Sequence, residues 1–305
     1  MLNENGILKG LIFKLVRKHI AGATADSAIR TALKFNENKI HTTITFLNEN
    51  PRDAIRARYN TNAYLQLLRQ VSRLHAYSDI SLRPSQLGYG IAGSSSDSIS
   101  EIIKLAEQEK IITWLEGQNS TELEYAVNIA ESHPSKYLGI ELPIPEIMKG
   151  GMYEKLKKQK LHLKISTYAY ENAKRESEEK TRRFRHEGHK HAAKSESESD
   201  HKWVDLLCRI SAGSALRLSS SDDKLAYKIM KRIKPDKGRL TLEVLLGYSP
   251  KRIRKLVKDN INVSIYIPYG RDWVPYAISR LTEGHIRDIA VAILDGEQKG
   301  SGEDG

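Results

Sequence analysis

The sequence predicts an α/β fold, a (β/α)8 TIM-type barrel with N-terminal helices and a C-terminal helix over the barrel mouth. Short runs rich in β-branched residues alternate with longer segments of helical period, which is typical of parallel β–α units. Eight such runs occur, and 305 residues are enough for a barrel, which typically takes about 250. An open, doubly wound sheet is the alternative, but no Gly-x-Gly-x-x-Gly fingerprint or Walker lysine supports it.

The N-terminal segment, residues 1–38, is predicted to be helical. Its apolar residues between Leu8 and Ile20 recur at helical spacing among lysines and arginines, which indicates an amphipathic helix. The barrel is predicted over residues 39–292, with a polar loop over 171–200, and a flexible tail is predicted over 293–305. The predicted strands cover residues 39–47, 79–83, 111–115, 137–142, 161–168, 214–218, 240–246 and 263–267. The helices predicted between them cover residues 51–74, 97–108, 121–132, 145–159, 201–210, 222–233 and 250–259.

The composition excludes several classes of protein. Cys208 is the only cysteine, so the chain can form neither an intrachain disulfide nor a zinc or iron–sulfur site built from several thiolates. No apolar run approaches the roughly 20 residues that a membrane span needs, and the N-terminus lacks the pattern of a cleaved signal peptide. We therefore expect a cytoplasmic protein.

The net charge of +11 is unevenly distributed. Residues 171–200 are highly charged but neutral overall, whereas residues 228–258 carry most of the basic excess. These bases fall mostly on two predicted outer helices with few aromatic residues between them. The pattern favours a solvated face first and an anionic membrane surface second, and it makes nucleic acid the least expected partner.

Two further features of the sequence, a histidine-rich tract and the single cysteine, are not expected to bind metal or to act in catalysis. The histidines His186, His189 and His191 resemble a metal-binding tract, but their polar surroundings offer no helix or strand face to fix a coordination geometry, so we predict no metal site. Cys208 lies among apolar residues at helical spacing and is expected to be a buried hydrophobic side chain rather than a nucleophile.

The chemistry of a barrel belongs at the carboxyl ends of its strands, and two arginines are predicted there. Pro275 begins a helix after the last strand, and Tyr276, Arg280 and Glu283 then share one face of it. An arginine beside aromatic walls can bind a small carboxylate, and Arg83 at the end of the second strand offers another cationic contact. The alternative is a solvated Arg–Glu pair under capping tyrosines, with Arg83 in a surface salt bridge.

The segment from Tyr266 to Glu283 resembles the C-terminal signature of the proline dehydrogenase family, a (β/α)8 barrel that holds non-covalent FAD at its mouth. It reads Tyr-Ile-Pro-Tyr-Gly, then Trp-Val-Pro-Tyr, then Arg-Leu and Glu283. Shorter matches follow in the same order and at similar spacing along most of the chain. They lie at residues 21–22, 45–49, 80–88, 115–116, 168–170, 222 and 245–247.

The resemblance implies FAD-dependent oxidation of L-proline to 1-pyrroline-5-carboxylate, with electrons passing to a quinone or another acceptor. It implies that Arg280 and Arg83 pair with the substrate carboxylate, and that Tyr266, Tyr276 and Leu245 enclose the pyrrolidine ring. The residues that it places on the cofactor side are Glu283, Glu243, Lys164, Tyr170, Ser221 and Asp222. A quinone acceptor would be found in a membrane, so docking of the basic helices on an anionic membrane surface would bring the protein close to it.

The chain departs from the family pattern at several of these positions. Ser279 stands where the family has the first of two adjacent arginines, Lys164 replaces an arginine, and Glu243 replaces a glutamine. Two rival hypotheses therefore stay open. One is a non-catalytic barrel that has lost flavin binding, and the other is a basic-surface protein that binds nucleic acid.

Overall fold

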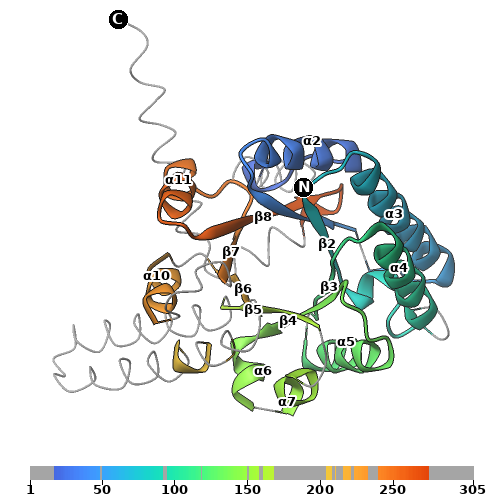
Figure 1. The fold of residues 1–305 in the computed structure, drawn as a ribbon. Helices are drawn as coiled ribbons and strands as arrows, with labels where there is room; N and C mark the ends of the chain where they lie inside the picture. The colour runs from blue at the N-terminus through green and yellow to red at the C-terminus, as the bar shows by residue number, and fades with distance from the viewer. Residues whose placement is uncertain are drawn as a thin grey trace, which may run out of the picture.

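The computed structural model describes residues 17–48, 50–91, 95–117, 119–149, 151–157, 161–167, 204–207, 210, 216–220, 223–232 and 240–274. Eight parallel strands follow one another in chain order and close into a barrel, because β1 pairs with both β2 and β8 (Figure 1). The predicted (β/α)8 barrel is confirmed. The strands are β1 (His41–Phe46), β2 (Ser78–Leu82), β3 (Thr113–Leu115), β4 (Leu138–Pro143), β5 (His162–Ser166), β6 (Leu216–Ser219), β7 (Leu240–Leu245) and β8 (Asn262–Tyr269).

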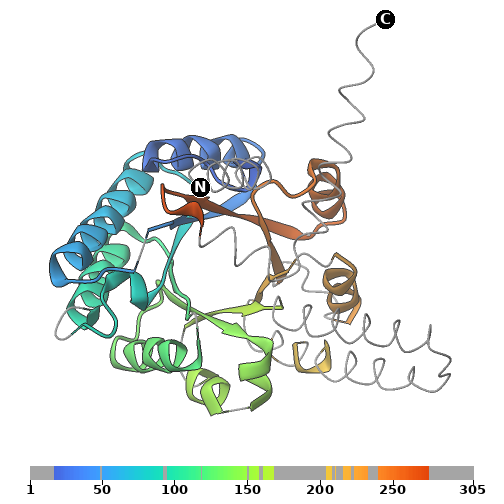
Figure 2. The same cartoon turned by 180° about the vertical axis from the view of Figure 1, so that it is seen from behind.

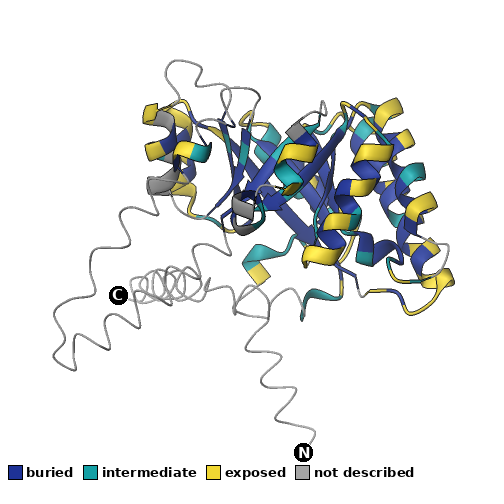
Figure 3. Cartoon of the chain, turned by 90° about the horizontal axis from the view of Figure 1, so that it is seen from below, coloured by how far each residue is buried: buried dark blue, intermediate teal, exposed yellow. Residues whose placement is uncertain are grey.

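Helices surround the barrel on the outside, as the two opposite views show (Figures 1 and 2). Their exposed residues lie on the outer faces, while the strands are buried (Figure 3). The longer helices are α2 (Ala25–Asn36), α3 (Ala54–Arg73), α4 (Ser95–Glu109), α5 (Ser120–Ser132), α6 (Ile144–Lys149), α7 (Gly151–Lys157), α10 (Asp223–Arg232) and α11 (Pro250–Lys258). Two short 3-10 turns, η1 (Arg17–His19) and η2 (Pro84–Leu87), complete the described elements.

Polar side chains fix where three of these helices begin. Thr24 and Ser27 form a capping box at the start of α2. Asp53 accepts a hydrogen bond of 2.7 Å from the backbone N–H of Arg56 at the start of α3, and Asn119 caps α5 in the same way. Each cap satisfies a backbone donor that the helix itself leaves unpaired.

The structure corrects one predicted helix. Residues 145–159 were expected to form a single helix, but two separate helices, α6 and α7, occupy this stretch. The sequence has glycines at positions 150 and 151, and glycine is the poorest helix former after proline, so a break here has a local cause. The helix α2, which precedes the first strand, packs against β1 and β8 and so completes the ring.

Several expectations lie outside the described residues. They are the helical pattern that begins at Leu8, the polar loop over 171–200, the tail over 293–305, the histidines of the loop and the helix predicted after Pro275. Within the part of the chain that the structure describes, no helix combines the length and the apolarity that a membrane span requires.

The strands alternate between an apolar outer face and a polar inner face. In β1, Ile44 is fully buried under the helices, whereas the hydroxyl of Thr43 bonds across the barrel to the carboxylate of Glu243 at 2.6 Å. In β4, Gly139 leaves room for a neighbouring ring, because a Cβ there would lie 2.4 Å from Trp114. The interior of this barrel is therefore a set of polar and charged side chains held in an apolar shell.

Candidate active site

One buried lysine lies at the centre of the barrel interior. The Nζ of Lys164 lies 3.1 Å from Glu116 Oε1, 2.9 Å from Glu141 Oε2 and 2.9 Å from Glu243 Oε1, and the lysine side chain is fully buried. The four residues come from β5, the end of β3, β4 and β7, and together we call them the Lys164 cluster. Three carboxylates around one ammonium fill its three N–H donors.

The Lys164 cluster reaches the carboxyl end of the barrel through Glu116. This residue follows β3, and its second oxygen accepts a hydrogen bond of 3.0 Å from the hydroxyl of Tyr266. Its first oxygen accepts a short hydrogen bond from Ser81 in addition to the contact with Lys164. The ring of Tyr266, on β8, is thereby held at the mouth.

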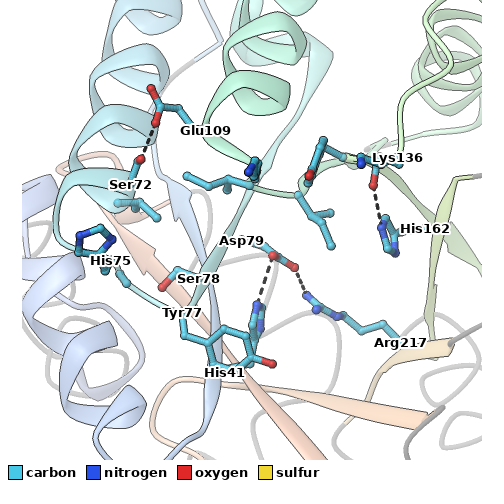
Figure 4. Close-up of a pocket in the computed structure, with 16 residues that line it drawn as sticks. His41, Ser72, His75, Tyr77, Ser78, Asp79, Glu109, Lys136, His162 and Arg217 are labelled. Carbon is cyan, nitrogen blue, oxygen red and sulfur yellow. Dashed lines mark hydrogen bonds and ion pairs between the residues drawn. The ribbon is translucent and has the colours of Figure 1, made fainter.

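A second charged layer lies below the Lys164 cluster, toward the amino ends of the strands. Asp79 accepts contacts from Arg217 at 2.7 Å and from His41 at 3.2 Å, and the indole N–H of Trp114 donates to it at 2.9 Å. Arg217 also lies 3.4 Å from Glu243, so it links the two layers. This layer faces a cavity of about 570 Å³ at the amino end of the barrel (Figure 4).

The surroundings push the pKa values of the buried carboxyl groups in opposite directions. Burial, together with the nearby Glu116 carboxylate, raises the pKa of Glu141 to about 7 even though Lys164 opposes the shift. Burial also acts on Glu116 and Asp79, but bases and hydrogen-bond donors outweigh it and lower both pKa values. For Lys164, burial is outweighed by the three carboxylates, so its pKa is raised and it stays protonated.

The structure brings three of the predicted substrate residues to the mouth. Arg83 immediately follows β2, and its charge acts on both Glu116 and Tyr266. Leu245 ends β7 and is paired in register with Tyr266 on β8. Among the described residues no carboxylate lies within ion-pair distance of Arg83, so its guanidinium is available to a ligand.

Six of the remaining predicted site residues lie outside the part of the chain that the structure describes. Tyr276, Arg280 and Glu283 lie outside the described residues, and so do Tyr170, Ser221 and Asp222. Their roles remain predictions.

Two predicted cofactor residues, Lys164 and Glu243, lie in the Lys164 cluster rather than on the open surface of the mouth. Lys164 is fully buried, and the carboxylate of Glu243 is 1% exposed and engaged by Thr43, Lys164 and Arg217. Any cofactor at the mouth would therefore lie above these side chains, which would form a charged floor beneath it.

The inner wall above that floor is lined by short side chains. Pro143, Ser166 and Ser219 are the last inward-facing residues of β4, β5 and β6, and they form one row across the three strands. Their side chains are short, and two of them offer hydroxyls. Just beyond β1, Asn48 buries both polar atoms of its amide without a hydrogen-bond partner in the described structure, which is a feature of sites that take a polar ligand. The described residues thus fit the ring system of a flavin.

Sequence reasoning missed Glu141, Asp79 and Arg217. Glu141 and Arg217 are single charged residues between apolar neighbours within a strand, as in Ile140-Glu141-Leu142, and Asp79 has such a neighbour on one side. In a strand buried on its outer face, such a residue must point into the barrel. The same pattern recurs at Lys164, Arg217 and Glu243, and this recurrence is the signal that could have revealed a charged interior.

The chain is similar to curated proline dehydrogenases along most of its length. It is 22% identical over 278 residues to proline dehydrogenase 2 of Bacillus subtilis strain 168. This match covers 87% of this chain and 85% of the relative. It is 20% identical over 274 residues to proline dehydrogenase 1 of Bacillus subtilis subsp. natto, covering 88% and 86%. The chain is a divergent relative of the proline dehydrogenases. No protein-family model matches it.

Solved structures support the fold of these dehydrogenases for this chain. The proline utilization A protein of Bdellovibrio bacteriovorus, solved after inactivation by N-propargylglycine, matches with a TM-score of 0.70 at 13% sequence identity. The match covers 93% of this chain and 34% of the other, so the chain spans about a third of that longer protein.

Proposed function

We propose that this protein is an FAD-dependent oxidoreductase that converts L-proline to 1-pyrroline-5-carboxylate. The observation that carries the proposal is the mouth of the barrel, where Arg83, Tyr266 and Leu245 stand together above the Lys164 cluster. Its relatives of similar length are named proline dehydrogenases. An arginine beside a tyrosine and a leucine matches a small molecule that has one carboxylate and an apolar ring.

Each predicted residue has a defined task in this proposal. Arg280 and Arg83 bind the substrate carboxylate, and Tyr266, Tyr276 and Leu245 enclose the pyrrolidine ring. FAD, when bound, supplies the two-electron acceptor for the hydride that leaves the ring carbon next to nitrogen. Ser166 and Ser219 offer hydroxyls to the flavin ring system, and the Lys164 cluster forms the floor beneath it.

The cofactor contacts predicted from the sequence extend this proposal beyond the described residues. Tyr170, Ser221, Asp222 and Glu283 are proposed to hold the remainder of FAD, with Glu283 supporting Arg280. We propose that the electrons then pass to a quinone or another acceptor.

The arginines provide the test of substrate binding. Replacing Arg280 with alanine is expected to abolish proline-dependent dye reduction at ordinary substrate concentrations and to raise the KM, because each charge-assisted hydrogen bond contributes about 1.5–3 kcal/mol. Arg83→Met should weaken proline binding by at least about tenfold through the loss of one such bond. Arg58→Met, which removes an exposed arginine paired with Glu101, serves as the matched control. Unchanged kinetics in both Arg280→Ala and Arg83→Met would refute the assignment.

One observation favours a second candidate, a barrel that keeps the fold without flavin. Lys164 and Glu243, which stand where the resemblance places cofactor contacts, satisfy each other inside the barrel. Side chains that already bond to each other do not need a cofactor as a partner. Titration of the purified protein with FAD separates the two candidates, since only the first predicts saturable binding.

The basic helices suggest how an acceptor in a membrane could be reached. On α11, Ile253 and Leu256 are buried while all of its bases are exposed, namely Lys251, Arg252, Arg254, Lys255 and Lys258. We propose that this face docks on an anionic membrane, with nucleic acid as the less favoured partner. Sedimentation with anionic vesicles should exceed sedimentation with neutral ones, and equal binding to both would rule the proposal out.

A further inference from the structure

The Lys164 cluster has more carboxylates than its bases neutralise. Glu116, Glu141 and Glu243 all lie within 3.1 Å of the one ammonium group. Two arginines of the described structure act on the same carboxylates: Arg217 is shared between Glu243 at 3.4 Å and Asp79 at 2.7 Å, and the charge of Arg83 acts on Glu116. Four carboxylates thus face three permanently charged bases. Like charges this close together in a buried site cannot all stay ionised, so one carboxyl group has to hold a proton over part of the neutral pH range.

The hydrogen-bond partners identify the carboxyl group that holds the proton. Glu116 accepts from Ser81, Lys164 and Tyr266, and Glu243 accepts from Thr43, Lys164 and Arg217. Each of these two anions is stabilised by three donors.

Among the described residues, Glu141 pairs with Lys164 alone. The charged groups that face it are Lys164 on β5, Glu116 after β3 and Glu243 on β7. Burial is the largest influence on Glu141, and it raises the pKa of this carboxyl group to about 7. A base poised at that value exchanges protons efficiently near neutral pH.

The Lys164 cluster is connected to the mouth. The side chain of Glu141 is 18% exposed and that of Glu116 is 15% exposed, whereas Lys164 is fully covered. Burial and the neighbouring Glu116 carboxylate raise the pKa of Tyr266, so its hydroxyl keeps its proton and donates it to Glu116. A continuous hydrogen-bonded route therefore runs from Tyr266 through Glu116 and Lys164 to Glu141.

We propose that the Lys164 cluster is the proton acceptor for the substrate amine, with Glu141 as the group that carries the proton. The inference rests on the proposed function for its substrate. Proline arrives as a secondary ammonium, and its nitrogen must lose a proton before the adjacent C–H bond can break to form C=N.

The proton transfers balance along this route. The ammonium proton passes to the Tyr266 oxygen as the hydroxyl proton of Tyr266 passes to Glu116. That proton lies on Oε2 of Glu116, whereas Lys164 contacts Oε1, so the carboxyl group rotates to bring the proton to Lys164. Lys164 takes it up as it gives one of its own protons to Glu141. Tyr266, Glu116 and Lys164 end as they began, and Glu141 ends as a neutral carboxylic acid. Glu141 receives the proton through the other three residues, so we describe it as a positioning residue that also holds the proton.

Infrared spectroscopy of the protein without substrate tests whether Glu141 holds the proton. The wild type is expected to show the carbonyl stretch of a protonated carboxylic acid that disappears as pH rises through about 7. Glu141→Gln should lack this signal, and the control Glu101→Gln, which changes an exposed carboxylate, should keep it. The inference is overturned if the signal persists in Glu141→Gln or never appears in the wild type. Glu141→Asp provides a second variant that retains a carboxyl group, and it should shift the midpoint of the signal, whereas an unchanged midpoint would count against the inference.

The pH profile of the loaded enzyme tests whether the substrate uses this proton acceptor. The kcat/KM for proline should rise through an ionisation near 7 in the wild type, and Glu141→Gln should lose that ionisation together with a factor on the order of 10² in rate at higher pH. If the ionisation persists in Glu141→Gln, the inference fails and the proposed function stands. If proline reduces no flavin in the wild type, the proposed function fails, while the infrared titration still decides whether Glu141 holds a proton.

Discussion

The raised pKa of Glu141 makes a quantitative prediction about stability. The pKa of this carboxyl group rises from its ordinary value of 4.5 to about 7 in the folded barrel, mainly through burial. Between these two values the folded protein holds a proton that the unfolded chain has released, so the free energy of unfolding falls as pH rises. A shift of this size corresponds to about 3 kcal/mol, most of it lost between about pH 5 and about pH 8.

Replacing Glu141 with glutamine should remove this loss, because glutamine keeps the shape of the protonated acid and does not ionise. Relative to the wild type, the variant is expected to gain roughly 2–3 kcal/mol in unfolding free energy between about pH 5 and about pH 8. Urea unfolding at several pH values measures the difference, and the other titrating groups are common to both proteins. Glu101→Gln is the control: Arg58 lowers the pKa of Glu101 from its ordinary value of 4.5, so the difference between this variant and wild type should stay constant between about pH 5 and about pH 8 and change only at lower pH. A difference between Glu141→Gln and wild type that stays constant with pH would refute the reasoning.

Three further changes test the packing of the interior and the charges within it. Asp79→Asn leaves the guanidinium of Arg217 without its closest partner and should cost about 3–5 kcal/mol in urea unfolding, so a loss below about 1 kcal/mol would contradict the account. Gly139→Ala places a Cβ 2.4 Å from Trp114 and should destabilise the protein by about 1–3 kcal/mol. In the control Gly151→Ala the new Cβ meets no atom within 4 Å, so the Tm should stay unchanged or rise. Equal changes in Tm for the two variants would contradict the packing around Gly139. Gly270→Ala, where φ is +138° and a Cβ would lie 2.1 Å from the carbonyl oxygen of Leu47, should lower the Tm, and a Tm equal to the wild-type value would contradict the close approach.

The barrel could be predicted from the sequence because its signals are local. Runs such as His41–Phe46 are rich in β-branched residues, and the outer helices repeat apolar residues at helical spacing. The break between α6 and α7 was missed because the apolar pattern continues across the two glycines. Pattern alone does not show where a weak helix former ends a helix.

The mouth and the interior differed in how far they could be predicted. Arg83 was predicted because it follows a strand whose carboxyl end must face the mouth, and Tyr266 was predicted because it belongs to the segment that resembles the proline dehydrogenase signature. The Lys164 cluster was missed because its contacts join residues up to 79 positions apart, as between Lys164 and Glu243. Such partners become neighbours only when the barrel closes with a particular stagger, and a single charged residue within a strand does not reveal that stagger.

The visible spectrum of the purified protein, incubated with FAD and then mixed anaerobically with L-proline, tests the central claim most directly. The proposed function predicts saturable FAD binding, with a bound-flavin spectrum that proline bleaches. A colourless protein that binds no FAD on titration would contradict it, and so would bound flavin that proline leaves oxidised.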